Sequence, residues 1–411
     1  MAKVSERASV SLFLGIDISK EKFDVCCIGS NGEKRFRMAA SMSREGFEEL
    51  LMQVSFLTKT NESVLIGMES TACYHINLYS FLTSKGCNVI IINPLLVSNF
   101  MKLQLRKTKT DKKDALVIAQ FLLTKKDSLY QNVLSPEIAD MRDLARQRES
   151  LIDQMTAIKS DTKRLLTITF PELEHVAGIF TKSMLRLLCH YPSAKAIQKA
   201  KRAKIASILI PGTYGKQTDE SVDMIIKAAA TSIGTSSPAK EVLIKQKATI
   251  LTQLENHLQE ITDMLVEQCQ AQMKDDMDIL TSILGIGEKS ATNFLVELGG
   301  EPRLFSSHRQ IIAMAGLDPS IYQSGQYVGL SKISKRGNRH LRRIIWLMTV
   351  KVIQFEEYFR RYFEKRIKDG LIYKKAVLAT AHKLIRVLFA MLSKRTPFTA
   401  KASVRSTVSA G

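Results

Sequence analysis

The feature that most constrains the fold is a pair of short apolar runs near the N-terminus, each ending in a carboxylate. Residues 12–16 lead into Asp17, and residues 64–68 lead into Glu69. Apolar runs of this length are typical of buried strands. Because an acid ends each run, the pattern predicts one acidic site at the end of a sheet.

The first 125 residues alternate between strand-like and helical patterns. Four residues separate the first two apolar runs, and a Gly-Ser-Asn-Gly-Glu stretch at 29–33 separates the next two, which is a hairpin signal. Three hairpin-linked strands followed by strand–helix alternation predict a mixed α/β sheet of the ribonuclease-H-like order. The expected strands are 12–18, 23–28, 36–40, 64–69 and 89–93, and the expected helices are 44–56, 74–85 and 114–123.

Two further acids, Asp111 and Asp114, lie three residues apart at an expected helix start. That spacing places them on one helical turn. Hard cations such as Mg²⁺ take oxygen ligands, and paired ions can stabilise both oxygens of a phosphoryl transfer. We therefore predict that Asp17, Glu69, Asp111 and Asp114 converge on a site for Mg²⁺ or Mn²⁺.

The charge balance points to a polyanionic partner. The 411 residues include 60 Lys and Arg against 40 Asp and Glu, a net charge of +20. Basic side chains that neutralise phosphates release counterions, which favours nucleic acid as the partner. The six cysteines form no C-x-x-C pair, and no apolar run reaches the roughly 20 residues of a membrane span. We expect a cytoplasmic protein with reduced thiols and no membrane partner.

The middle of the chain has the pattern of two long amphipathic helices. Residues 135–170 begin with Ser-Pro-Glu, a helix-start signal, and residues 240–270 repeat the apolar spacing. They predict an antiparallel pair or an intermolecular coiled coil, with an ordinary helical bundle as the alternative. We expect domains at 1–130, 131–275 and 276–395, with a disordered tail at 396–411.

The third expected domain opens with an apolar helix, a Gly-Ile-Gly turn and a second helix. This helix-hairpin-helix pattern would present backbone N–H groups near Gly285 and Gly287, with Lys289 beside them, to a phosphate. A plain pair of helices is the alternative. The predicted fold class is thus α/β plus α: a mixed-sheet domain, a long helical middle and a helical C-terminal domain.

A basic cluster lies around the glycine turn at 337. Its six members form an expected phosphate-gripping loop that leads into a helix. These residues are Lys332, Lys335, Arg336, Arg339, Arg342 and Arg343. Ser324 lies in a polar loop near this cluster, before Gly325, and is a candidate nucleophile, although most loop serines are structural.

Taken together, these motifs resemble a known family. The D…E…D-x-x-D pattern, followed by the helix-hairpin-helix, Ala-Gly-Leu-x-Pro, Gln-Ser-Gly and Ile-Ser-Lys-Arg-Gly-Asn, is similar to the DEDD transposases of the insertion-sequence-110 family and the related Piv/MooV invertases. The resemblance covers about residues 11–125 and 276–350. It implies a RuvC-like catalytic domain with bound Mg²⁺ and a serine nucleophile, which falls on Ser324.

The resemblance also implies partners. Members recombine donor and target DNA, and some are directed by a structured RNA. Such a protein would act at the bacterial or archaeal nucleoid, and joining two DNA partners implies a homodimer or homotetramer.

Three alternatives remain open from the residues. One is a RuvC-like nuclease in which water attacks and Ser324 is a bystander. Another is a non-catalytic helix-hairpin-helix nucleic-acid-binding protein. The last is an actin-like sugar kinase, because Leu-Gly-Ile-Asp-Ile-Ser at 14–19 also opens that fold, although the later glycine-rich phosphate loops are absent. The sequence does not give the DNA site, the role of residues 171–235, or whether the active site forms in cis or in trans.

Overall fold

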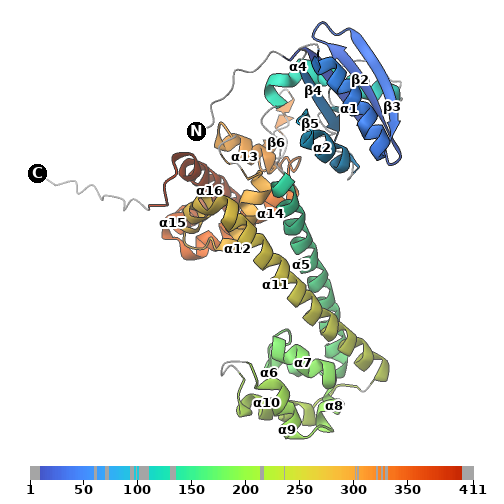
Figure 1. The fold of residues 1–411 in the computed structure, drawn as a ribbon. Helices are drawn as coiled ribbons and strands as arrows, with labels where there is room; N and C mark the ends of the chain where they lie inside the picture. The colour runs from blue at the N-terminus through green and yellow to red at the C-terminus, as the bar shows by residue number, and fades with distance from the viewer. Residues whose placement is uncertain are drawn as a thin grey trace, which may run out of the picture. The chain divides into compact units, whose positions relative to one another are not determined.

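The computed structural model divides the chain into two compact units, Met1–Pro136 and Glu137–Gly411. Figure 1 shows the fold of each unit. The described residues are 10–59, 63–69, 74–92, 97–98, 100, 111–129, 136–212, 217–235, 237–300, 302, 305–320, 323–324, 327–328 and 332–399.

The first unit is built on a five-stranded mixed sheet with the order β3-β2-β1-β4-β5. The central strand β1 pairs antiparallel with β2 and parallel with β4. The strands are β1 (Leu12–Ile18), β2 (Lys22–Gly29), β3 (Lys34–Ser41), β4 (Val64–Glu69) and β5 (Asn88–Ile92). The predicted mixed α/β sheet is confirmed.

Helices cover both faces of this sheet (Figure 1). Helices α1 (Arg44–Lys59) and α2 (His75–Ser84) pack on one face, and α4 (Asp111–Leu129) packs on the other. Strand alternation sends Leu14 and Ile16 into the α1–α2 core and Phe13 into the α4 core. The two faces are thus both apolar, which is why the strands are continuous hydrophobic runs.

Glycines bring α4 unusually close to the sheet. A Cβ on Gly15 would lie 2.2 Å from the backbone oxygen of Ala115 and 2.4 Å from the nitrogen of Ala119. A Cβ on Gly67 would lie 2.7 Å from a methyl group of Leu122. The α4 helix therefore crosses β1 and β4 at the two glycines that precede the strand-terminal acids.

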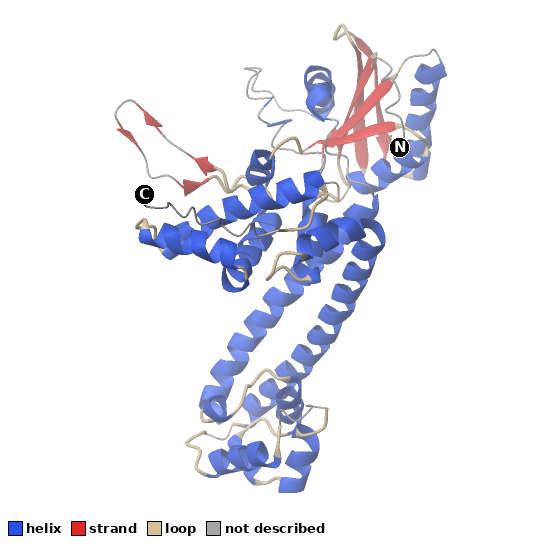
Figure 2. Cartoon of the chain, turned by 90° about the vertical axis from the view of Figure 1, so that its left-hand side faces the viewer, coloured by secondary structure: helices blue, strands red, loops and turns tan. Residues whose placement is uncertain are grey.

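The second unit contains two long antiparallel helices, α5 (Pro136–Thr169) and α11 (Pro238–Thr281). Side-chain pairs set their register: Arg148 Nε donates to Thr262 Oγ1 at 3.0 Å, and Lys247 Nζ lies 2.6 Å from Asp161 Oδ2. Early residues of α5 thus meet late residues of α11. The predicted antiparallel pair forms within one chain, as Figures 1 and 2 show.

A small helical subdomain, which we call the insert (residues 171–235), caps one end of this pair. Its core includes Leu188, Ile205 and Ile225, and it packs onto Leu166 of α5 and Leu251 of α11. Its helices are α6 (Leu173–Val176), α7 (Lys182–His190), α8 (Ala194–Gln198), α9 (Arg202–Leu209) and α10 (Asp219–Ala230).

A second helical group packs at the opposite end of α5 and α11. Its helices are α12 (Glu288–Leu298), α13 (His308–Met314), α14 (Arg339–Phe355), α15 (Glu357–Lys368) and α16 (Tyr373–Lys394). By length and composition alone α16 is apolar enough to cross a membrane. Half of its apolar window is buried, and α16 packs against α11, α13, α14 and α15, so it reads as the core helix of this group.

The beginning of the expected disordered tail is ordered against this group. The Phe398 ring stacks on Phe359 with centroids 5.9 Å apart, and its backbone N–H donates to Ser282 Oγ at 2.8 Å. Residues 396–399 are therefore not disordered, because an aromatic side chain anchors them. The remainder of that prediction, residues 400–411, lies outside the described residues.

Candidate functional site

The strand-terminal acids, Asp17 and Glu69, lie on one face of the sheet at the carboxyl ends of two neighbouring strands. In the parallel β1–β4 register Ile16 is opposite Met68, so Asp17 and Glu69 come next on neighbouring strands. Asp17 alternates in phase with Phe13, and Glu69 with Leu65, both of which belong to the α4 core. Both carboxylates are therefore on the α4 side, at the carboxyl ends of parallel strands.

A third acid of the sheet, Asp24, was not among the residues that the sequence predicts. Asp24 lies directly opposite Asp17 in the antiparallel β1–β2 register, and it is only 8 % exposed. Lys22 Nζ lies 3.4 Å from its Oδ2. Like charges directly opposite in a sheet are destabilising. The pairing of Asp24 with Lys22 offsets part of that repulsion. Its signal in the sequence is the odd acid within the apolar run 23–28.

Helix α4, which begins with the other two predicted acids, packs on the same face of the sheet. Its sheet-facing residues Ala115, Ile118, Ala119 and Leu122 follow the 3–4 spacing of one helical face. Asp114 immediately precedes Ala115, whose backbone oxygen lies against Gly15 of β1. Asp111 is the first residue of α4, one turn before Ala115, and its side chain lies outside the described residues. Asp111 and Asp114 thus stand at a helix start, as predicted.

The described carboxylates do not form a complete metal-binding group. Among the residues that the structure describes, no three His, Cys, Asp or Glu side chains are grouped so that they could hold a metal ion. The donor chemistry nevertheless suits a hard divalent cation, because every candidate ligand is a carboxylate and the strand ends place Asp17 and Glu69 on one face. Convergence of the four acids on a cation remains a prediction.

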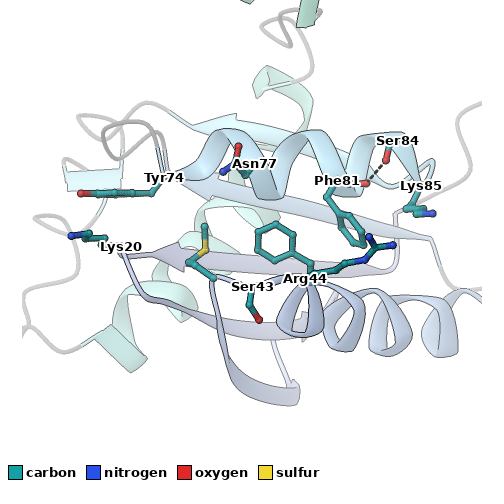
Figure 3. A pocket seen from close by; sticks show the side chains of 10 residues that line it. Lys20, Ser43, Arg44, Tyr74, Asn77, Phe81, Ser84 and Lys85 are labelled. Atoms are coloured by element: carbon teal, nitrogen blue, oxygen red, sulfur yellow. Dashed lines mark hydrogen bonds between the residues drawn. The ribbon is translucent and has the colours of Figure 1, made fainter.

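A cleft of about 610 Å³ lies on the opposite face of the sheet, between α1 and α2 (Figure 3). Phe47 and Phe81 are among the lining residues, with ring centroids 5.5 Å apart. Lys20 and Tyr74 lie at one end of the cleft. Both rings belong to the α1–α2 core rather than to the α4 side. The cleft is therefore separate from the carboxylates and is not where they would act.

Ser324 lies in a two-tier β-hairpin rather than in an irregular loop. The base of the hairpin pairs β6 (Pro319–Ser320) with β9 (Lys332–Ile333), and the outer tier pairs β7 (Gln323–Ser324) with β8 (Tyr327–Val328). Figure 2 draws the two tiers in red, one beyond the other. In the outer tier Ser324 is opposite Tyr327, and Gln323 is opposite Val328. The prediction of a polar loop was wrong at Ser324, because strand pairing fixes its backbone.

Two glycine turns hold the base of this hairpin. A Cβ on Gly337 would lie 2.2 Å from the oxygen of Met314 and 2.5 Å from the nitrogen of Gly316. Gly316 itself has a φ of +62°, which favours glycine. Ser334 Oγ also donates to Asp318 Oδ1 at 2.6 Å. The Ala-Gly-Leu and Lys-Arg-Gly motifs thus pack against each other through close backbone contacts.

A buried carboxylate secures the helix that follows. Asn338 caps α14, since its Oδ1 accepts hydrogen bonds from the N–H groups of His340 and Leu341. Its Nδ2 donates to Glu297, which is 1 % exposed and also lies 3.2 Å from Arg146 Nε. Sequence reasoning missed Glu297, whose only signal was an acid within the apolar helix 288–298.

The predicted basic cluster divides into two sets. Arg342 donates to the oxygen of Ala315, and Arg343 pairs with Glu149 and Asp153 of α5. Arg342 and Arg343 therefore stabilise contacts within the second unit. Lys335, Arg336 and Arg339 are exposed, and none forms an ion pair within the described residues. The side chain of Lys332 lies outside those residues.

The hydrogen bonds that Glu149 accepts set its ionisation. Burial by itself would raise the pKa of Glu149, but hydrogen bonds from His340 and Arg343 outweigh it and hold the pKa below its ordinary value. The pKa of Asp153 is also lowered, chiefly by its hydrogen bond from Arg343. The charged form is thus favoured at both α5 carboxylates that pair with α14.

The predicted Gly-Ile-Gly turn joins α11 to α12. Gly285 has a φ of +97°, and a Cβ there would lie 2.9 Å from the oxygen of Lys351 in α14. Gly287 is the N-cap residue of α12, with nothing within 4 Å of a Cβ position. The first glycine therefore serves packing, whereas the second faces open space. Lys289, in the first turn of α12, is exposed.

Comparison with protein families identifies two matching segments. Residues 14–171 match a transposase family described as DEDD transposases of the IS110 type. Residues 277–364 match the transposase family IS116/IS110/IS902. The first match spans the carboxylates and α5, and the second spans the Ser324 hairpin and the basic cluster. All of the insert after residue 171 lies outside both matches.

Full-length relatives have a similar extent. The chain is 25% identical to the insertion element IS110 43.6 kDa protein of Streptomyces coelicolor, over 93% of this chain and 94% of that protein. It is 23% identical to a pilin gene-inverting protein of Moraxella bovis, over 94% and 97% of the two chains. It is also 23% identical to the transposase for insertion sequence element IS1328 of Yersinia enterocolitica, over 94% and 98%.

Proposed function

Because this chain belongs to the DEDD transposases of the IS110 type, we propose that it cuts and rejoins DNA strands through a covalent bond to Ser324, assisted by a divalent cation at its carboxylates. That the chain is a DNA transposase follows from the family. The serine intermediate, the cation and any RNA partner are the proposal. The observation that carries it is the arrival of Asp17, Glu69 and the start of α4 at one face of one sheet edge.

The carboxylates contribute negative charge and oxygen ligands at that edge. Asp17, Glu69, Asp111 and Asp114 would hold the cation, with Mg²⁺ as the first choice and Mn²⁺ as the alternative. When bound, such an ion supplies charge stabilisation for the phosphate oxygens of a strand-transfer reaction. Asp24, opposite Asp17, would help to fix the orientation of the Asp17 side chain.

The serine would conserve the energy of the cut phosphodiester. In the first step a bond forms between Ser324 Oγ and phosphorus, the bond from phosphorus to one sugar oxygen breaks, the serine proton leaves and the freed sugar oxygen gains a proton. In the second step the sugar hydroxyl of a new strand attacks the same phosphorus and restores the serine hydroxyl. The exchange needs no nucleotide cofactor. It also requires Ser324 to meet the carboxylates during the reaction, in cis or from another subunit.

The exposed cations near the hairpin base would position the DNA. Lys335, Arg336 and Arg339 precede or begin α14, at the base of the hairpin that carries Ser324. Phosphate contacts of this kind fix register and orientation without reading sequence. A structured RNA, which the resemblance of the motifs implies, would be the second nucleic-acid partner to test.

The decisive experiment for the carboxylates is a strand-cleavage assay on DNA that carries the element ends. Asp17→Asn should lower cleavage at least 100-fold and keep DNA binding within about twofold. Asp140→Asn, which removes an exposed acid of α5, is the matched control and should cleave normally. Normal cleavage by Asp17→Asn, or by the unmodified protein in excess chelator, would overturn the proposal.

A nuclease that uses water is the competing function. It would share the carboxylates but would leave free DNA ends and would not need Ser324. The two are separated by whether cleaved DNA stays attached to protein after denaturation.

A further inference from the structure

The insert carries an unusual distribution of charge. Between His175 and Thr218 the sequence has eight Lys or Arg residues and no Asp or Glu. Four of those lysines fall within ten residues, at Lys195, Lys199, Lys201 and Lys204, on α8, α9 and the turn between them. All four are exposed, and none forms an ion pair within the described part of the chain.

The fold explains why these lysines point away from the protein. Ile197 of α8 and Ile205 of α9 are 1% and 0% exposed, in the core that the insert shares with α5 and α11. With those positions turned inward, the helical period leaves the lysines on the outer face. We call Lys195, Lys199, Lys201 and Lys204 the insert lysine face.

The neighbouring arginine behaves differently. Arg202 lies within the same segment, but its Nε is 2.7 Å from Asp223 Oδ1 and its Nη2 is 3.0 Å from Asp219 Oδ1. The two nearby acids of α10 are thereby committed to Arg202. The four lysines of the insert lysine face therefore repel one another. Like charges one helical turn apart destabilise a helix. A polyanion bound there would remove that repulsion.

We propose that the insert lysine face binds the phosphate backbone of a nucleic acid, as a contact separate from the catalytic machinery. The lysines lie within a few residues of one another, so their fields add over the Debye length of about 8 Å at physiological salt. Lysines without a rigid hydrogen-bonding partner suit contacts to phosphate rather than to bases. The inference rests on the proposed function only in taking nucleic acid as the polyanion.

The position of the insert suggests what such a contact would do. Glu149 of α5 is tied to α14, and Leu166 of α5 is in the insert core. The helix rises by about 25 Å between these residues, at about 1.5 Å per residue. A nucleic acid that contacts both the insert and the start of α14 would thus be held at two separate points along the second unit.

The test is the salt dependence of binding by the full-length protein in chelator, where no strand is cut. The variant replaces all four lysines of the face with Gln. If the four ammonium groups each neutralise a phosphate, the slope of log affinity against log salt should become shallower by about 3.6 on duplex DNA and about 2.8 on a single strand. Parallel titrations with duplex DNA, single-stranded RNA and a hairpin RNA identify which nucleic acid the face prefers.

A charge-matched control removes the same number of exposed lysines elsewhere. Its substitutions are Lys34→Gln, Lys245→Gln, Lys274→Gln and Lys394→Gln. A slope change in the lysine-face variant that exceeds the control on at least one nucleic acid supports the inference. A change equal to or smaller than the control on all of them overturns it.

Two further measurements separate binding from misfolding. Arg202→Gln removes a neighbouring cation that is already paired, so the slope should stay within about 0.5 of the unmodified protein. Lysine acylation followed by mass spectrometry should detect protection of the insert lysine face when nucleic acid is added. Unchanged acylation of all four lysines at saturating nucleic acid would also overturn the inference. Neither readout depends on cleavage, so a failure here leaves the Asp17 experiment to judge the catalytic proposal.

Discussion

Asn338 Nδ2 donates a 2.6 Å hydrogen bond to Oε2 of Glu297, and this bond ties the start of α14 to a carboxylate inside the helical group. Glu297 also pairs with Arg142 and Arg146 of α5. One buried side chain thus links α5, α12 and α14. The exposed cations around Asn338 depend on it for their position.

Glu297→Ala should destabilise the helical unit by about 3–5 kcal/mol, because removing one partner leaves the Arg142 side chain, which is only 15% exposed, without its countercharge. The single tryptophan, Trp346, lies in α14 and reports on this unit alone. Urea unfolding followed by its fluorescence measures the change. Arg44→Ala, which breaks an exposed pair with Glu48 in the other unit, is the control and should leave that transition unmoved. A Glu297→Ala midpoint equal to that of the unmodified protein would contradict the role of Glu297.

Acid should loosen the link between α5 and α14. The pKa of Glu149 is lowered in the folded state, so its contribution to stability is complete above the unfolded pKa and is lost as pH falls through the folded pKa. Trp346 fluorescence should therefore detect a loss of stability between about pH 5 and the folded pKa. Glu149→Gln should be less stable at pH 7 and show a smaller loss over this range. An identical pH profile in the two proteins would show that Glu149 does not carry the effect.

The two glycines of the α11–α12 turn should differ in what they do. Gly285→Ala places a Cβ 2.9 Å from a backbone oxygen at a φ of +97°, so it should lower stability by about 1–3 kcal/mol. Gly287→Ala meets no atom of the chain within 4 Å, so folding should be unchanged while affinity for nucleic acid falls. Thermal unfolding and a binding titration on both variants check this. If both substitutions lower the unfolding temperature equally, the assignment of packing to Gly285 alone is wrong.

The exposed half of the basic cluster should carry the phosphate contacts near the hairpin. Replacing Lys335, Arg336 and Arg339 with Ala should make the salt dependence of duplex binding shallower by about 2.7 units if each contacts one phosphate. Arg343→Ala should instead lower stability, because Arg343 is paired with Glu149 and Asp153. An unchanged slope in the triple variant would mean that these cations form only a solvated face.

Local patterns predicted the elements well. Strands β1 and β4 match their predicted bounds, 12–18 and 64–69, because each is an apolar run with a carboxylate at or next to its last residue. The long helix α5 follows from its 3–4 spacing and its Ser-Pro start at 135–136. The spacing also predicted α11, but only over 240–270, whereas the helix runs over Pro238–Thr281. The acids at the strand ends share a face for the same reason, since alternation is a local property.

What the sequence could not predict depends on residues far apart in the chain. Arg343 pairs with Glu149, 194 positions away, and this pairing removes it from the set of free cations. Ser324 is held by cross-strand pairing with Tyr327, although its surroundings read as a polar loop. Asp24 has no motif of its own and emerges only when the β1–β2 register places it opposite Asp17.

The most direct test of the account is a search for DNA bound covalently to Ser324. A reaction on a nicked or mismatched substrate is stopped with denaturant and digested with protease, and the peptide that contains Ser324 is examined for attached nucleotides by mass spectrometry. The account predicts an adduct on Ser324 in the unmodified protein, its loss together with all strand exchange in Ser324→Ala, and its retention in Ser320→Ala and Ser331→Ala. If Ser324→Ala cuts DNA at the unmodified rate and only free ends accumulate, water is the nucleophile and the recombinase mechanism is wrong.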